Sequence, residues 1–254
     1  MQKATFAPRR MDTSTDILSI LRTGKVTIQG EFIWGSNFTF LAKVESSEGD
    51  LVAVYKPNRG QRPLWDFPVD TLARREVAAY IVSEEIGWRM VPDTVYRTKG
   101  PLGSGSLQLF IDHDPEYHYF NFPIEERQRL RPVVLLDIII NNADRKGSHV
   151  LRDPDGNLWL IDHGICFHVE DKLRTVIWDF MGQPIPENLY ADLNCFVNKL
   201  KTVNGSTSNL NTRLFEYLDL AEIGAIISRT ENLIHTKHFP EPDPHRRGYP
   251  WPQL

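Results

Sequence analysis

The sequence has little cysteine and no long hydrophobic run. Its 254 residues include two cysteines, Cys166 and Cys195, which are too few and too isolated for a disulfide framework or a paired-cysteine zinc site. We expect both to be reduced cysteines of the core. No segment approaches the roughly 18 apolar residues of a membrane span, and the first residues lack the apolar stretch of a signal peptide. The sequence therefore predicts a cytoplasmic protein without integral membrane association.

An excess of charge of one sign is also missing. The chain has 29 Lys and Arg, 33 Asp and Glu, and a net charge of -4, with the basic residues scattered among acidic ones. This balance provides no surface for nucleic acid. The content of 41% apolar and 11% aromatic residues is that of a globular protein, long enough for two lobes. We expect a small-molecule or protein substrate; the oligomeric state is left open, with a monomer favoured.

The first half of the sequence reads as strands around one main helix. Residues 12–23 have the apolar spacing of a short amphipathic helix, which Thr13 or Ser14 could cap. A stronger helix is indicated where apolar residues share one stripe and Gly87 follows as a C-cap. The expected main helix is Leu72–Ile86, and the expected strands are Lys25–Phe32, Asn37–Val44, Leu51–Tyr55, Met90–Tyr96 and Ser106–Ile111.

The second half is mainly helical. Apolar runs of helical length are Glu125–Asn142, Glu187–Thr202 and Thr212–Thr230. Two short apolar runs, Val150–Arg152 and Leu158–Ile161, are joined by a turn sequence and predict a hairpin. The tail from His238 has no periodicity and is expected to lie over the surface. The pattern predicts an α+β fold with an antiparallel-sheet N-lobe at residues 1–110 and a helical C-lobe at residues 111–254.

Two aspartates flank the predicted hairpin. Asp144 follows the apolar helix in a short polar loop with Lys146, and Asp162 comes directly after the hairpin, before His163 and Gly164. This order is the layout of a kinase catalytic loop and metal loop, in which the first Asp accepts a hydroxyl proton and the second holds Mg²⁺. The alternative is that both carboxylates cap local turns. The spacing predicts that Asp144 is the catalytic base, with Lys146 beside it, and that Asp162 binds the metal.

His149 stands five residues after Asp144, where the kinase pattern has Asn as a metal ligand. An imidazole there could bind a softer ion such as Mn²⁺, donate a hydrogen bond to a carboxylate, or pack in the core. Other histidines with nearby acids raise a metallohydrolase alternative, but no HExxH spacing is present. We therefore treat His149 as a candidate metal ligand.

Lys56 is the second functional signal. It continues the strand face of Val52 and Val54, because residues two apart share a face. An inward-pointing ammonium needs an acidic partner, and Glu76 on the apolar stripe of the next helix is the expected one. In kinases such a pair positions the α- and β-phosphates of ATP. The alternative is a surface lysine and a solvated glutamate.

Two further segments are expected to touch the nucleotide. The turn Gly35-Ser36-Asn37 could present backbone N–H groups to phosphate, although it lacks the GxGxxG pattern. The segment Gln108–Ile111, including Phe110, falls where an inter-lobe linker passes the adenine. We expect its backbone groups to bind the base.

At these residues the chain resembles the phosphatidylinositol 3- and 4-kinase-like superfamily, through an uncharacterised bacterial branch and, more distantly, type II phosphatidylinositol 4-kinases. The likeness covers roughly residues 30–185, and the stretch Arg75–Pro92 is also similar to secretory-pathway kinases; HipA-type kinases share the general plan. The segments that carry it are Val54–Pro57, Arg75–Tyr80, Leu136–Arg145 and Ile161–Gly164. The resemblance implies a protein-kinase-like two-lobe fold.

The resemblance also implies functional roles. Lys56 and Glu76 would hold ATP phosphates, Asp144 would act as the base and Asp162 would bind the metal. The sequence departs from the family at His149, where most relatives keep Asn, which bears on the choice between Mg²⁺ and Mn²⁺. We expect an ATP-dependent phosphotransferase acting on a hydroxyl of a polyol, sugar, inositol or protein; the alternatives are a nucleotide-binding pseudokinase and an AMP transferase.

Overall fold

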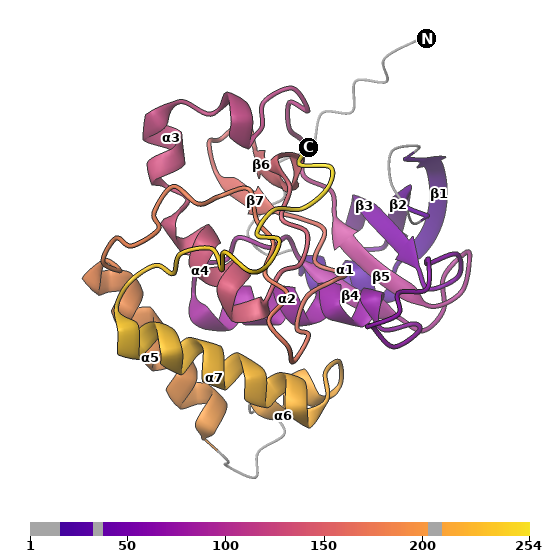
Figure 1. The fold of residues 1–254 in the computed structure, drawn as a ribbon. Helices are drawn as coiled ribbons and strands as arrows, with labels where there is room; N and C mark the ends of the chain where they lie inside the picture. The colour runs from indigo at the N-terminus through magenta and orange to yellow at the C-terminus, as the bar shows by residue number, and fades with distance from the viewer. Residues whose placement is uncertain (1–15, 33–37, 203–209) are drawn as a thin grey trace.

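The computed structural model describes residues 16–32, 38–202 and 210–254 (Figure 1). Its strand-rich half is a five-stranded antiparallel sheet in the order β1-β2-β3-β5-β4. The strands are β1 (Lys25–Glu31), β2 (Phe40–Ser46), β3 (Gly49–Pro57), β4 (Thr94–Arg97) and β5 (Gly105–Leu109). All five predicted strands are present, with ends shifted by a few residues.

One face of this sheet packs against α1 (Ile17–Thr23). Ile20 and Leu21 of α1 join a core with alternate residues of β2 and β3, including Ala53 and Tyr55. The helix begins at Asp16, whose carboxylate accepts a hydrogen bond from the Ser19 amide at 3.2 Å. Asp16 therefore has the capping role that the sequence analysis gave to Thr13 or Ser14, both of which lie outside the described residues.

The helix α2 (Leu72–Ile86) has the predicted bounds and lies between the sheet and the helical half (Figure 1). Gly87 ends it with a φ of 94°, a conformation that glycine adopts without a steric penalty. The chain then turns sharply, because the Ser83 hydroxyl accepts the amides of Met90 and Val91 at 2.8 and 3.2 Å. Most side chains of α2 are buried, which fixes the position of Glu76.

The other half is mainly helical. Its core is formed by α4 together with apolar residues of α2, α5 and α7. The helices are α3 (Ile124–Gln128), α4 (Arg131–Ile140), α5 (Glu187–Lys201), α6 (Leu210–Phe215) and α7 (Leu220–Thr236), with short 3₁₀ turns at Tyr119–Asn121 and Gly147–His149 and a hairpin of β6 (Val150–Arg152) and β7 (Leu158–Leu160). The α+β fold class is confirmed.

Two predicted helices are each divided in the structure. The run predicted as Glu125–Asn142 breaks between α3 and α4, because Pro132 favours the first turn of a new helix. The run predicted as Thr212–Thr230 breaks before α7, where Asp219 and Glu222 form a reciprocal capping box. The apolar spacing was interpreted correctly, but the local start signals divide both runs.

The C-terminal tail crosses the helical half from the end of α7 to the region of the hairpin (Figure 1). Its Gly248 carbonyl accepts hydrogen bonds from the Thr175 amide at 3.0 Å and the Trp178 indole at 3.3 Å. Near the end, the Gln253 carbonyl accepts the Gly147 amide at 2.8 Å. The tail thus contacts the loop that follows Asp144.

The two cysteines differ in environment. Both are free thiols, but Cys166 is buried whereas Cys195 is exposed on α5. The prediction that both belong to the core is therefore wrong for Cys195. Among the described residues, none of the helices has the length and apolar character needed to cross a membrane. The lobe boundary between residues 110 and 111 stays a prediction.

Candidate active site

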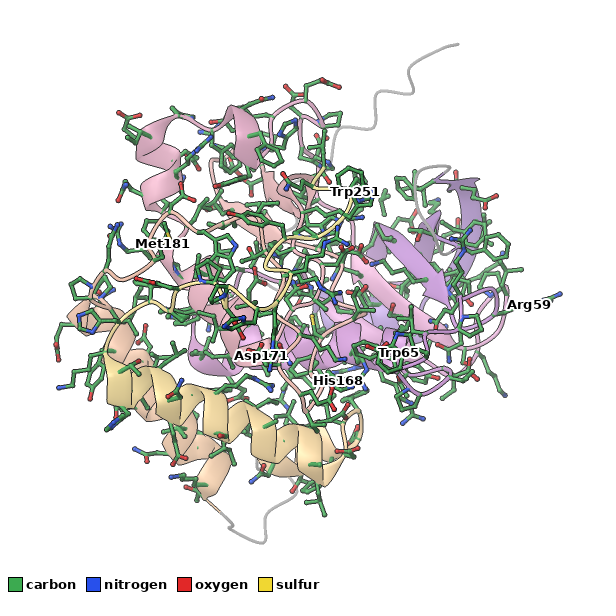
Figure 2. All side chains as sticks on the ribbon, viewed as in Figure 1. Arg59, Trp65, His168, Asp171, Met181 and Trp251 are labelled. Atoms are coloured by element: carbon green, nitrogen blue, oxygen red, sulfur yellow. The ribbon has the colours of Figure 1, made fainter. Side chains whose placement is uncertain are left out.

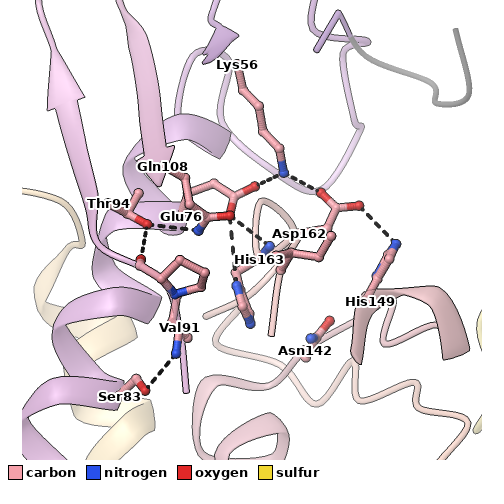
Figure 3. A network of polar contacts seen from close by, with 12 residues as sticks. Lys56, Glu76, Ser83, Val91, Thr94, Gln108, Asn142, His149, Asp162 and His163 are labelled. Atoms are coloured by element: carbon pink, nitrogen blue, oxygen red, sulfur yellow. Dashed lines mark hydrogen bonds and ion pairs between the residues drawn. The ribbon is translucent and has the colours of Figure 1, made fainter. Parts of the chain in front are cut away.

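Lys56 joins the two halves of the molecule. Its ammonium contacts Glu76 Oε1 from α2 and Asp162 Oδ1, at 2.8 Å, from the loop after β7 (Figure 3). Burial by itself lowers the pKa of Lys56, but the charges of Asp162 and Glu76 outweigh it and raise this pKa above its usual value. The lysine is therefore cationic, and the predicted contact with Glu76 is present.

Glu76 is held in place from two sides. Its side chain is almost fully buried. Besides the contact with Lys56, its Oε2 accepts a hydrogen bond from the His163 amide at 3.0 Å. A buried carboxylate is stable only with such partners. The α2 carboxylate thus fixes both the ammonium and the backbone next to Asp162.

Asp162 occupies an uncommon backbone conformation. Its φ is 62°, in the left-handed region that residues other than glycine rarely adopt. The positive charge of Lys56 holds the pKa of Asp162 well below its usual value, against the opposing effect of burial. About half of the side chain remains exposed. Asp162 is therefore an ionised carboxylate with surface available to a further ligand.

Asp144 lies in the loop after α4. Its amide donates to the Asn142 side chain at 2.9 Å, and its Oδ2 lies 3.3 Å from Lys146 Nζ. Burial raises the pKa of Asp144 to about 6, with Lys146 opposing and the like charge of Asp162 adding to the rise. A carboxylate with a pKa near neutrality is suited to accept a proton.

Arg145 is the buried centre of the loop. It is fully buried, and its N–H groups donate to Asp137 at 2.9–3.2 Å and to the carbonyls of His149 and Ile161 at 3.1 and 3.0 Å. It also contacts His163 Nε2 at 2.9 Å. Because guanidinium only donates, Nε2 must be the acceptor and the His163 proton lies on Nδ1. Arg145 therefore connects the Asp144 loop to both ends of the hairpin.

His149 lies against Asp162. Its Nε2 is 3.3 Å from Asp162 Oδ2, while its buried Nδ1 has no hydrogen-bond partner among the described residues (Figure 3). Burial lowers the pKa of His149 to about 4. The imidazole is thus neutral at pH 7, the form that can bind a metal.

The donor pair fits a divalent cation completed by other ligands. Two ligands about 2.1 Å from one ion and at right angles are about 3.0 Å apart, close to the 3.3 Å between His149 Nε2 and Asp162 Oδ2. Among the described residues, no group of three or more His, Cys, Asp or Glu side chains could hold an ion alone. This donor set suits a metal that takes its remaining ligands from phosphate oxygens.

The other predicted site residues are placed less directly. Gly35, Ser36 and Asn37 lie outside the described residues. Gln108 lies inside β5, paired with both β3 and β4, and its side chain donates to Thr94 at 2.8 Å. The connection between the halves therefore begins after Leu109, later than the sequence suggests.

Phe110 and Ile111 start this connection. The Phe110 amide donates to the Val52 carbonyl at 3.0 Å, and the Ile111 carbonyl contacts His113 Nδ1 at 2.8 Å. Their contacts with a nucleotide stay a prediction.

Sequence reasoning missed the residues that orient the site. Asn142, Asp137 and Arg145 position the Asp144 loop, and Arg75 on α2 contacts both the Cys166 carbonyl and Glu222 of α7. Polar residues within otherwise apolar segments were the available signal, since a buried charge needs a partner. The partners themselves could not be identified from the sequence.

Comparison with known proteins assigns the chain to a family. A family model described as phosphatidylinositol 3- and 4-kinase matches residues 67–193. Protein Rv2133c of Mycobacterium tuberculosis is 37% identical over 95% of this chain and 97% of its own length. Phosphatidylinositol 4-kinase gamma 4 of rice is 28% identical over 71% of this chain, and that of Arabidopsis thaliana 37% over 44%. The matched regions span 38% and 24% of these plant proteins.

Solved structures agree on the fold. A Golgi casein kinase with Mn/ADP bound has a TM-score of 0.55 at 16% identity, covering 86% of this chain and 74% of that one. Hydra Fam20 gives 0.54 at 14% identity, covering 87% of both chains. The Helicobacter pylori proinflammatory kinase CtkA gives 0.51 at 9% identity, covering 86% and 94%. These likenesses confirm the predicted two-lobe kinase-like fold, and the chain belongs to the phosphatidylinositol 3- and 4-kinase family of ATP-dependent kinase-like enzymes.

Proposed function

We propose that the chain transfers the γ-phosphoryl group of ATP to a hydroxyl group of a small polyol, sugar, inositol or protein. One observation carries this proposal: the Lys56 ammonium lies between the carboxylates of Glu76 and Asp162, which come from different halves of the molecule. A cation in this position can bind the α- and β-phosphates. Phe110, Ile111 and the segment Gly35–Asn37, which the sequence predicts to be a turn, would bind the rest of the nucleotide.

Asp162 and His149 would hold a divalent cation, Mg²⁺ or Mn²⁺, on the phosphates. The ion would neutralise negative charge on the phosphate oxygens. The ionised state of Asp162 and the neutral state of His149 both support this role. The structurally similar Golgi casein kinase carries Mn/ADP, which supports nucleotide and divalent metal binding by the same fold.

Asp144 and Lys146 would serve the acceptor. The Asp144 carboxylate would orient the acceptor hydroxyl and take its proton, while the Lys146 ammonium, 3.3 Å away, would stabilise charge on the transferred group. Catalysis of this kind depends on positioning and electrostatics and needs no covalent enzyme intermediate. Glu76 and Arg145 would maintain the geometry.

The proposal is tested with ATP labelled at either the α- or the γ-phosphate. Purified protein is incubated with Mg²⁺ or Mn²⁺ and a panel of polyols, sugars, inositols and proteins. Transfer of γ-label that is lost in Asp162→Ala supports the proposal. Transfer of α-label identifies an AMP transferase, and nucleotide binding without any transfer identifies a pseudokinase.

The pKa of Asp144 predicts how turnover depends on pH. Only the ionised carboxylate accepts a proton, so activity is lost as pH falls below the value of about 6 set by burial. We expect kcat/KM at pH 7 to exceed that at pH 5 by about tenfold. Nucleotide affinity measured over the same range serves as the control. A flat profile from pH 5 to 7 would contradict the base role.

His149 predicts a preference among metals. An imidazole ligand favours Mn²⁺ over Mg²⁺ relative to an amide oxygen. We expect His149→Asn to lower the ratio of Mn²⁺- to Mg²⁺-supported nucleotide affinity several-fold, measured by calorimetric titration. His235→Asn, on the exposed face of α7, is the matched control. An unchanged ratio of affinities in His149→Asn would contradict the proposal that His149 is a metal ligand.

A further inference from the structure

A cavity lies in the helical half, apart from the Lys56 site. It has a volume of about 490 Å³, within the range of about 300–1,000 Å³ typical of small-molecule sites. Its walls come from the segment 169–178, from α7 and from the tail at 240–248. None of the residues assigned to the nucleotide or the metal lines it.

The cavity has more basic than acidic groups in its walls. The basic residues are Lys172, Arg174, Arg229, Arg246 and Arg247, and the acidic residues are Asp171, Glu241 and Asp243. Two of the basic groups are already paired. Arg246 pairs with Asp171 and Asp243, and Lys172 pairs with Asp66 and Glu170, which lie outside the cavity wall.

Three arginines, Arg174, Arg229 and Arg247, have no carboxylate at ion-pair distance among the described residues. Among the described wall carboxylates, Glu241 alone has no basic group at ion-pair distance. The wall residues themselves, five basic and three acidic, therefore have a formal charge of +2.

Arg229 is fixed with one nitrogen unused. Its Nε donates to the Ile139 carbonyl at 2.9 Å and its Nη1 to the His168 carbonyl at 3.3 Å. Its Nη2 is shielded from solvent and has no hydrogen-bond partner among the described residues. Burial lowers the pKa of Arg229 to about 10, so the group is still charged at neutral pH. A shielded, unpaired N–H on a cation is costly and indicates a missing acceptor.

The remaining walls suit a small organic molecule next to the catalytic loop. Trp178 presents an aromatic surface and is held by its hydrogen bond to Gly248. Arg174 borders the loop of Asp144, because its amide donates to the Asn142 carbonyl at 2.9 Å and its carbonyl accepts the Arg145 amide at 3.0 Å. A ligand in the cavity would thus lie against the segment that supports Asp144.

We propose that this cavity binds a small molecule carrying a phosphate monoester, through Arg174, Arg229 and Arg247. Guanidinium groups match phosphate oxygens in geometry and charge. The ligand could be the acceptor of phosphoryl transfer or an effector of it; the same phosphate-binding chemistry serves both. Binding requires neither nucleotide nor metal, so this inference is tested independently of the proposed function.

The test is calorimetric titration with glycerol 3-phosphate and glucose 6-phosphate, with glycerol and glucose as uncharged counterparts. We expect the phosphate esters to bind and their counterparts not to bind. Arg229→Gln should weaken ester binding at least about tenfold and Arg247→Gln about threefold. Arg59→Gln is the matched control, because Arg59 is exposed on the strand-rich half, away from Asp171 in the cavity wall (Figure 2).

The variants also separate folding from binding. If Arg229→Gln lowers the thermal midpoint of unfolding, the effect of Arg247→Gln on ester binding decides the outcome, because Arg247 is exposed. Ester binding no tighter than that of the uncharged counterparts, or an equal loss in Arg59→Gln, overturns the proposal. With ATP and a divalent cation present, phosphorylation of the bound ester identifies an acceptor, whereas a change in turnover without its consumption identifies an effector.

Discussion

Asp144→Asn is expected to lower the rate of phosphoryl transfer by about 10²–10⁴-fold, the usual contribution of a general base. The amide keeps the size and shape of the carboxylate but cannot accept a proton. Because Asp144 forms no hydrogen bond or ion pair with Lys56 or Glu76 in the described part of the chain, nucleotide affinity should change less than about threefold. Single-turnover transfer and calorimetric ATP binding measure the two quantities separately.

The control for this substitution is Asp155→Asn. Asp155 lies in the exposed turn of the β6–β7 hairpin, so its replacement should leave both rate and affinity unchanged. Equal losses of transfer and of nucleotide binding in Asp144→Asn would contradict the base role. That result would instead place Asp144 among the groups that hold the nucleotide.

Arg145→Met is expected to lower the free energy of unfolding by about 3–5 kcal/mol, the range for breaking a buried ion pair. The substitution leaves the Asp137 carboxylate buried without its cation. It also leaves the carbonyls of His149 and Ile161 without donors. Urea denaturation followed by circular dichroism gives the difference, provided that the slope of the transition is unchanged.

A second substitution separates charge from packing. If the cost comes from an uncompensated charge, Asp137→Leu combined with Arg145→Met should recover part of the lost stability. Arg59→Met, at an exposed position, should change the free energy of unfolding by less than about 0.5 kcal/mol. A loss of under about 1 kcal/mol in Arg145→Met would mean that the buried network is not the support of the catalytic loop.

Local signals in the sequence predicted the elements that carry the site. The alternation along β3 placed Lys56 on the same face as Val52 and Val54 because strand periodicity is strictly two. The apolar stripe and Gly87 defined α2 to the residue, and with it the position of Glu76. The Lys56–Glu76 contact could be predicted for this reason: both partners lie on regular elements.

Long-range polar contacts could not be predicted in the same way. Arg145 contacts groups from α4, from the 3₁₀ turn at Gly147–His149 and from the loop after β7. No periodicity relates these segments, because their proximity results from the packing of the whole helical half. The contact of the Gln253 carbonyl with Gly147 is equally invisible in a tail without a repeating pattern.

Helix ends were the other source of error. The apolar spacing continues through Arg129 and Leu130, so it predicts one long helix where the structure has α3 and α4. Apolar periodicity indicates which residues face the core. Two successive helices that pack on the same core can therefore show one continuous apolar pattern. Pro132 and the capping box at Asp219 were the signals that should have outweighed the spacing.

A crystal structure with Mn²⁺ and a non-hydrolysable ATP analogue tests the convergence of Lys56, Glu76, Asp144 and Asp162 most directly. Anomalous scattering locates the ion without ambiguity. We predict that it lies within about 2.3 Å of the Asp162 carboxylate and of phosphate oxygens, with Lys56 Nζ in hydrogen-bond contact with the phosphates. A nucleotide bound elsewhere, or an ion without contact to Asp162, would contradict the proposed site.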